Sequence, residues 1–251
     1  MEKNMLTFAI TTTTKLAGLS LYKNDKLLGE IHVEMAKTHS TTILEQIDSL
    51  LKWTGKKLDE IENVIVSIGP GSFTGVRIAI SVVKGLFFGR NVNFYEVNEL
   101  DALGFQAYYN LEVNLGNNED VKIYSLIDSR KEKIYCAAYE TSVESELKLV
   151  KNYEVTKLDN VIDEIIESNG KNNKKVYLIG DAVFNYKAKI LDRLGNCVKI
   201  FEDKNLKVNT MTFMQIFLDK NLKNANVIRK TDIFNLKPDY LEKSQAERDK
   251  K

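Results

Sequence analysis

Hydrophobic positions near the start of the chain alternate in the way that β-strands require. Residues 6–14, 16–22 and 27–35 are short runs rich in β-branched and aromatic side chains. Asn24 and Asp25, which favour turns, separate the second run from the third. The pattern predicts three antiparallel strands, the last two of them joined as a hairpin.

The period then changes to that of a helix. Residues 40–54 and 73–89 carry apolar side chains at steps of three and four, which predicts two amphipathic helices. Between them, residues 63–69 form a continuous apolar run, as expected of a strand buried on both faces. Residues 91–97 and 98–110 predict a further strand and a further helix.

Residues 110–120 are polar, rich in Asn and Gly, and show no periodicity, which predicts an exposed junction between two lobes. The second half repeats the order of the first, with strands at 122–129, 133–140 and 146–155, then a helix at 157–170, a strand at 175–180, a helix at 182–195, a strand at 197–202 and a helix at 210–223. We therefore predict an α/β protein with an N-terminal lobe at 1–109 and a C-terminal lobe at 121–251, each a mixed sheet with helices. This layout is ribonuclease-H-like, and it occurs in pairs in the actin-like ATPase (ASKHA) superfamily.

Composition narrows the class of protein. The 251 residues are 43% apolar and 28% charged, with a net charge of +1, which excludes a strongly basic protein that coats nucleic acid. Cys136 and Cys197 are too few for a disulfide framework, and both are expected to be buried, inert thiols. With no signal-peptide pattern and no apolar run of about 18 residues, the sequence predicts a cytoplasmic protein without a membrane segment.

A glycine-rich string, SIGPGSFTGVR, joins the buried strand to the second helix. Its glycines, Gly69, Gly71 and Gly75, could cradle a phosphate at the helix start or could serve a tight strand-to-helix turn. The string is not a Walker A motif, because Val76 and Arg77 follow Gly75. It is not the dinucleotide fingerprint either, because the glycines are spaced GxGxxxG.

The whole string resembles the signature of the TsaB (YeaZ) family. Three other segments are similar to that family: THSTTILEQIDSLL, LIDSRKEKIYCAAY with Asp128, Arg130 and Tyr135, and the closing KPDYLEKSQAE. We expect Asp128 and Arg130 to fix their hairpin by local hydrogen bonds rather than to perform acid–base chemistry.

The resemblance implies a function for the chain. The family supplies a non-catalytic scaffold subunit, required with the catalytic paralogue TsaD and the ATPase TsaE, for threonylcarbamoylation of adenosine 37 in tRNAs that read ANN codons. It implies pairing with TsaD, a homodimer when alone, and contact with tRNA only through the complex. It implies no catalytic residue and no cofactor in this chain; whether a nucleotide binds at a subunit junction stays open.

The sequence departs from the paralogue at the positions that matter for catalysis. TsaD carries two metal-binding histidines four residues apart at a helix start, where this chain has Glu99 and Leu103. Thr11 stands where actin-like kinases have an Asp for metal and phosphate. Since Leu cannot bind a metal, and His32 and His39 lie elsewhere, we predict no metal site.

The two N-lobe helices carry more apolar residues than one sheet face needs, which predicts a partner surface on them. The candidate residues are His39, Ile43, Ile47, Leu50, Phe73, Arg77, Ile80 and Lys84. Within this set, Ile47 and Ile80 are expected at the centre, and the residues His39, Arg77 and Lys84 at the rim.

The alternatives are an enzyme, either a kinase or a peptidase, and a protein that binds RNA by itself. An actin-like small-molecule kinase is disfavoured by Thr11, and Gly180 is the only candidate for a second phosphate loop. A peptidase-type hydrolase is disfavoured because the chain has no Gly-x-Ser-x-Gly motif. Independent RNA binding is disfavoured by the balanced charge.

Overall fold

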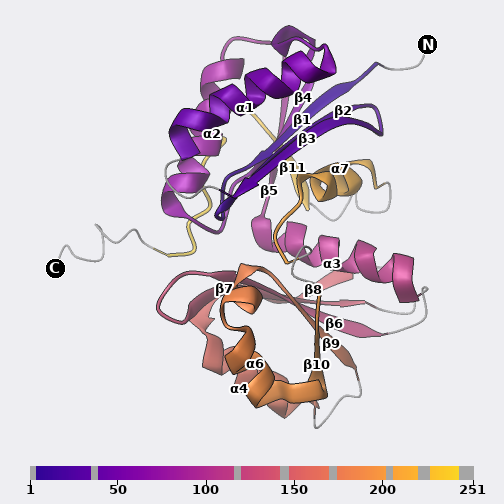
Figure 1. Cartoon of the computed structure of the whole chain (residues 1–251), viewed down its shortest axis with the longest axis vertical. Helices are drawn as coiled ribbons and strands as arrows, with labels where there is room; N and C mark the ends of the chain where they lie inside the picture. The colour runs from indigo at the N-terminus through magenta and orange to yellow at the C-terminus, as the bar shows by residue number, and fades with distance from the viewer. Residues whose placement is uncertain are drawn as a thin grey trace, which may run out of the picture. The chain divides into compact units, whose positions relative to one another are not determined.

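The computed structural model describes residues 4–34, 39–115, 120–141, 147–169, 174–201, 206–219 and 227–242. They form two compact units, coloured along the chain in Figure 1. Unit 1 contains the described residues of Met1–Glu99 and Asn209–Tyr240, and unit 2 contains those of Leu100–Val208 and Leu241–Lys251. No helix in these described stretches is long and apolar enough to cross a membrane.

Unit 1 is built on a six-stranded mixed sheet with the order β11-β5-β4-β1-β2-β3. The strands are β1 (Leu6–Thr11), β2 (Leu16–Lys23), β3 (Lys26–Glu34), β4 (Asn63–Ser67), β5 (Asn93–Val97) and β11 (Ile228–Thr231). β1 pairs antiparallel with β2 and parallel with β4. Asn24 makes the predicted turn between β2 and β3 with a φ of 56°.

Helices cover both faces of this sheet. On one face lie α1 (His39–Thr54) and α2 (Phe73–Phe87), and on the other lies α7 (Thr210–Leu218) (Figure 1). A short 3₁₀ turn, η1 (Leu58–Glu60), follows α1. β4 is buried at every position, with Val64, Ile65 and Val66 as its apolar centre, as a central parallel strand requires.

Unit 2 repeats the plan with a five-stranded sheet in the order β10-β9-β6-β7-β8. Its elements are β6 (Val121–Asp128), β7 (Lys133–Thr141), β8 (Leu147–Lys157), α4 (Leu158–Asn169), β9 (Lys175–Ile179), α5 (Asp181–Asn185), α6 (Lys187–Leu194), η2 (Gly195–Cys197) and β10 (Val198–Ile200). Helix α3 (Glu99–Leu115) packs on one face of the sheet, where Gly104 lies against the ring of Tyr139. The predicted fold class, two ribonuclease-H-like mixed sheets of the actin-like type, is confirmed.

The bounds of the two units differ from the predicted lobes at 1–109 and 121–251. The predicted junction at 110–120 was wrong for its first half, because α3 continues to Leu115 and buries Leu111. Residues 116–119 lie outside the described stretches, and Asp120 is exposed. Residues Asn209–Tyr240, which were predicted to belong to the C-terminal lobe, belong to unit 1 instead. The reason is that α7 packs on β1 and β2, and β11 pairs with β5.

Candidate functional site

The glycine-rich loop packs against the end of β1 rather than around an open space. The Ser72 N–H donates to the carbonyl of Thr13 at 2.6 Å, and the Thr12 hydroxyl donates to the carbonyl of Gly75 at 2.6 Å. A Cβ on Gly71 or Gly75 would overlap the carbonyl oxygens of Thr13 and Thr12. The close approach of the backbone explains why residues 71 and 75 are glycines. It agrees with the alternative of a tight strand-to-helix turn.

Gly69 has a different reason to be glycine, since its φ is 102°. The helix that follows is capped within the loop, because the Ser72 side chain accepts from the Gly75 N–H at 3.2 Å. One of the N–H groups that could bind an anion at the start of α2 is therefore already used.

A buried polar cluster lies at the strand ends of unit 1, at the start of α3. Glu99 is fully buried, and Thr11 Oγ1 donates to its carboxylate oxygens at 3.1 Å and 3.3 Å. The hydroxyl of Ser67 donates to the same carboxylate, and the Glu99 N–H donates to the Gly69 carbonyl at 2.7 Å. Leu103, one helical turn further on, is buried as well.

His32 forms its hydrogen bond with α7 and not with the Glu99 carboxylate. His32, on β3, places Nε2 at 3.2 Å from the Thr210 hydroxyl, and burial lowers its pKa below the usual value. His39 is the first residue of α1, and its side chain lies outside the described atoms. Among the residues that the structure describes, no group of three or more His, Cys, Asp or Glu could hold a metal ion.

The predicted partner surface was wrong for half of its eight residues, because they are buried. Four of them are at most 5% exposed and belong to the core of unit 1: Ile43, Ile47, Leu50 and Ile80. They pack with Phe8 and Ile10 of β1, so the apolar stripes of α1 and α2 serve their own sheet. On α2, Arg77 is exposed, whereas Phe73 and Lys84 are half-buried.

The sequence pattern also missed what covers the second side of α2. Residues 232–240, which we call the strap, pack along this helix within unit 1. The Phe234 ring meets the Phe88 ring edge-to-face at 6.2 Å, and the Tyr240 ring stacks on the Phe73 ring at 4.7 Å. Leu236 of the strap is fully buried. The apolar residues of the closing segment were the signal that could have predicted this contact.

Large apolar side chains remain exposed on α1, at the residue that follows α2, and on the strap. The exposed fractions are 48% for Leu44, 76% for Trp53, 68% for Phe88 and 77% for Phe234. Together with Arg77, which is also exposed, they define what we call the unit 1 helical surface. Exposed aromatic and Arg side chains of this kind are typical anchors of protein–protein interfaces.

In unit 2, the corresponding strand ends carry carboxylates. Asp128 accepts from the Arg130 N–H at 2.8 Å and from the Tyr186 hydroxyl at 3.1 Å, which confirms the expected local fixing of the hairpin. Burial raises the pKa of Asp181 to about 6, and the nearby charge of Asp128 adds to that effect, although Asp181 accepts the Asp128 N–H at 2.8 Å. Tyr186 also interrupts the predicted helix at 182–195, dividing it into α5 and α6.

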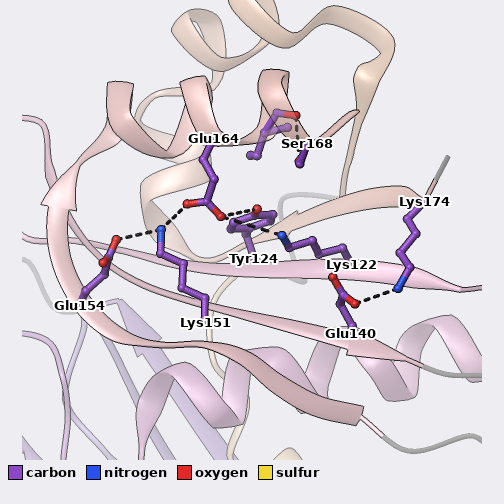
Figure 2. A network of polar contacts seen from close by, with 9 residues as sticks. Lys122, Tyr124, Glu140, Lys151, Glu154, Glu164, Ser168 and Lys174 are labelled. Atoms are coloured by element: carbon purple, nitrogen blue, oxygen red, sulfur yellow. Dashed lines mark hydrogen bonds and ion pairs between the residues drawn. The ribbon is translucent and has the colours of Figure 1, made fainter. Parts of the chain in front are cut away.

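A network of charged side chains ties α4 to the sheet of unit 2, as Figure 2 shows. Glu164 accepts from the Tyr124 hydroxyl at 2.9 Å and from the ammonium of Lys151, and Lys151 also contacts Glu154 at 2.9 Å. Burial opposes ionisation of Glu164, but the hydrogen bonds from Lys151 and Tyr124 outweigh it and lower its pKa. Glu164 therefore has its charge balanced within the unit, which indicates a structural role.

Comparison with known proteins agrees with this architecture. Residues 27–250 match the family model described as TsaD, tRNA N6-adenosine threonylcarbamoyltransferase. A Bacillus subtilis protein named tRNA threonylcarbamoyladenosine biosynthesis protein TsaB is 25% identical over 243 residues, which are 97% of this chain and 96% of that protein. The chain belongs to the TsaB (YeaZ) family. The Haemophilus influenzae TsaB is 29% identical over 134 residues, 53% of each protein.

A solved structure shows the same fold. YeaZ from Pseudomonas aeruginosa superposes with a TM-score of 0.70 at 19% identity, and the match covers 94% of this chain and 100% of that one. In this member of the TsaB family, the signature string forms the turn packed on Thr12 and Thr13, and the closing Pro-x-Tyr-Leu segment supplies the end of the strap.

Proposed function

We propose that this chain is the non-catalytic scaffold subunit of a complex that attaches a threonylcarbamoyl group to adenosine 37 of tRNAs reading ANN codons. In this proposal TsaD carries the catalysis and the ATPase TsaE is the third component. The names of its TsaB relatives support the pathway, because they describe biosynthesis of threonylcarbamoyladenosine in tRNA.

One observation carries the assignment of a non-catalytic role. At the two positions where the resemblance places metal-binding histidines in TsaD, this chain has Glu99 and Leu103, both buried. The Glu99 carboxylate is turned to the hydroxyls of Thr11 and Ser67, and the Leu103 side chain offers no donor atom at all. The residues present do not fit the metal centre of the paralogue, although the family model of that enzyme matches the chain.

The unit 1 helical surface is the partner site in this proposal. It would bind the TsaD paralogue in the complex and a second copy of the chain when TsaD is absent. Contact with tRNA would then come through the complex, which agrees with the net charge of +1. A cytoplasmic location follows from the same proposal.

Reconstitution with each subunit omitted tests the proposal. We expect transfer to tRNA to require this chain, TsaD and TsaE together, and this chain alone to hydrolyse neither ATP nor peptides. After washing with a chelator, it should hold no stoichiometric transition metal. Full transfer without this chain, or a bound metal ion, would contradict the assignment.

A variant within this chain sharpens the test. Glu99→Gln keeps the size of the side chain and can still accept from Thr11 and Ser67. We expect the complex to keep transfer activity within about threefold, whereas the loss of a catalytic carboxylate costs about 100-fold or more. A loss of that size in a folded Glu99→Gln variant would make Glu99 a catalytic residue.

A further inference from the structure

Arg77 is held in an unusual way for an exposed arginine. Its guanidinium carbon lies 3.9 Å from the centre of the Phe73 ring, and its Nε donates to the Tyr240 hydroxyl at 2.6 Å. Phe73 and Tyr240 are themselves stacked at 4.7 Å. The side chain is therefore fixed by contacts to α2 and to the strap, although it faces solvent.

These contacts leave part of the guanidinium available. Nε is used by Tyr240, and no carboxylate of a described residue forms an ion pair with Arg77. The two terminal nitrogens are the pair that binds a carboxylate in a planar, bidentate way. Because the side chain is already ordered, little rotamer freedom remains to be lost when such a carboxylate arrives.

The helix that carries Arg77 has no negative charge of its own, and the two acidic residues of the strap, Asp232 and Asp239, form no ion pair with Arg77. Helix α2 has the sequence FTGVRIAISVVKGLF, which contains two cations and no acidic residue. The other cation, Lys84, places Nζ at 3.4 Å from the Phe234 carbonyl of the strap. A partner that covers α2 must therefore supply the complementary negative group itself.

We propose that Arg77, positioned by Phe73 and Tyr240, binds an Asp or Glu carboxylate of the TsaD paralogue when the unit 1 helical surface is covered. This rests on the proposed function. The strap is then part of the partner site, since Tyr240 holds the arginine that makes the contact. Arg77 and Tyr240 act in binding and take no part in the transfer reaction.

Isothermal titration of the full-length chain with the TsaD paralogue, at low and high NaCl concentration, tests this contact. We expect Arg77→Lys, which keeps the charge but loses the planar pair of nitrogens, to weaken binding by about tenfold or more at low salt. Tyr240→Phe keeps the stacked ring but frees Nε, so we expect a smaller loss, about threefold to tenfold. The difference between wild type and Arg77→Gln should shrink at high salt.

The matched control is Arg193→Lys on α6 of unit 2, where Arg193 already pairs with Asp159 and Asp163. Its affinity should equal that of wild type. If the wild-type chain does not bind TsaD, the proposed function fails. If wild type binds and Arg77→Lys binds equally well, only the inference fails.

Three further results would assign another occupant and overturn the inference. One is that Arg77→Lys changes self-association, measured by sedimentation, but leaves TsaD binding intact, which indicates that Arg77 binds a second copy of the chain. Another is loss of tRNA binding alone, which indicates a phosphate. The third is tighter TsaD binding both in Arg77→Lys and in a chain without residues 243–251, which indicates that the chain's own tail, with Glu247 and Asp249, occupies this arginine.

Discussion

The sheets of the two units share an order of five strands, to which unit 1 adds β11, but the helices that cover them carry different side chains at the surface. In unit 2, α4 and α6 are joined by ion pairs, with Lys189 at 3.0 Å and Arg193 at 3.2 Å from Asp159. In unit 1, α2 has no acidic residue, and bulky aromatic side chains such as Trp53 and Phe88 stand exposed. Helices α4 and α6 of unit 2 pair their charges with each other, whereas the unit 1 helical surface presents aromatic side chains that a partner would cover. The fold is duplicated, but the surface is not.

The largest expected effect concerns an interior feature that the two units share. A Cβ on Gly75 would overlap the Thr12 carbonyl, and a Cβ on Gly180 would overlap the Leu126 carbonyl. In addition, the φ of Gly180 is 119°. We expect Gly75→Ala and Gly180→Ala each to lower the free energy of unfolding by about 3 kcal/mol or more, measured by denaturant titration.

The matched control is Gly85, on the exposed side of α2, where an added Cβ meets nothing within 4 Å. Gly85→Ala should raise the free energy of unfolding by about 0.5–1 kcal/mol, because alanine favours the helix. If Gly75→Ala were as stable as Gly85→Ala, the packing of the glycine-rich turn on β1 would be incorrect.

The next prediction tests whether the partner binds the unit 1 helical surface rather than the helices of unit 2. We expect Trp53→Asp and Phe88→Asp to weaken binding to the TsaD paralogue about 100-fold, because a carboxylate would be placed where an aromatic anchor is buried. The control in unit 2 is Ile166→Asp, where the native side chain is 47% exposed on α4. Equal losses from the unit 1 and unit 2 variants would remove the distinction between the surfaces.

The acidic groups of unit 2 predict a dependence on pH. The pKa of Asp181 is raised to about 6 in the fold, so the native state binds this proton more tightly than the unfolded chain does. The resulting stabilisation of the native state is present at low pH and is lost as the pH rises through about 6. Relative to Asp181→Asn, wild type should lose about 2 kcal/mol of unfolding free energy between about pH 4 and pH 6. A constant difference across this range would show that the pKa of Asp181 is not raised in the fold.

The smallest effect concerns the two thiols, where the sequence prediction was wrong for one of them. Cys136 is buried in β7 and burial raises the pKa of its thiol to about 12, but Cys197 is exposed. A thiol reagent should therefore label the native chain once, at Cys197, without unfolding it. Rapid labelling of Cys136 would indicate that the sheet of unit 2 opens.

Hydrophobic periodicity was sufficient to predict most elements, because a strand or helix that buries one face must repeat its apolar residues at a fixed step. It could not predict β11, whose four residues Ile228–Thr231 are too short to show a period. It also could not show that this strand and α7 return to unit 1, since pairing with β5 is a long-range contact.

The candidate surface shows the same limit of sequence patterns. The sequence showed that α1 and α2 carry more apolar residues than one sheet face needs, and this led to the prediction of Ile47 on α1 and Ile80 on α2 as interface residues. A pattern on one helix cannot tell which apolar side faces the sheet and which faces a distant segment such as the strap. Arg77 was identified as a surface residue, but its contacts with Phe73 and Tyr240 depend on a segment some 160 residues further along, since Tyr240 lies 163 positions after it.

Amide hydrogen exchange tests the central claim most directly, that the partner covers the helical layer of unit 1. The chain would be measured alone and in the presence of saturating TsaD paralogue. We expect added protection in α2 and in residues 232–240, with no change in α4 and α6. Protection in α4 and α6 with α2 unchanged would contradict the account.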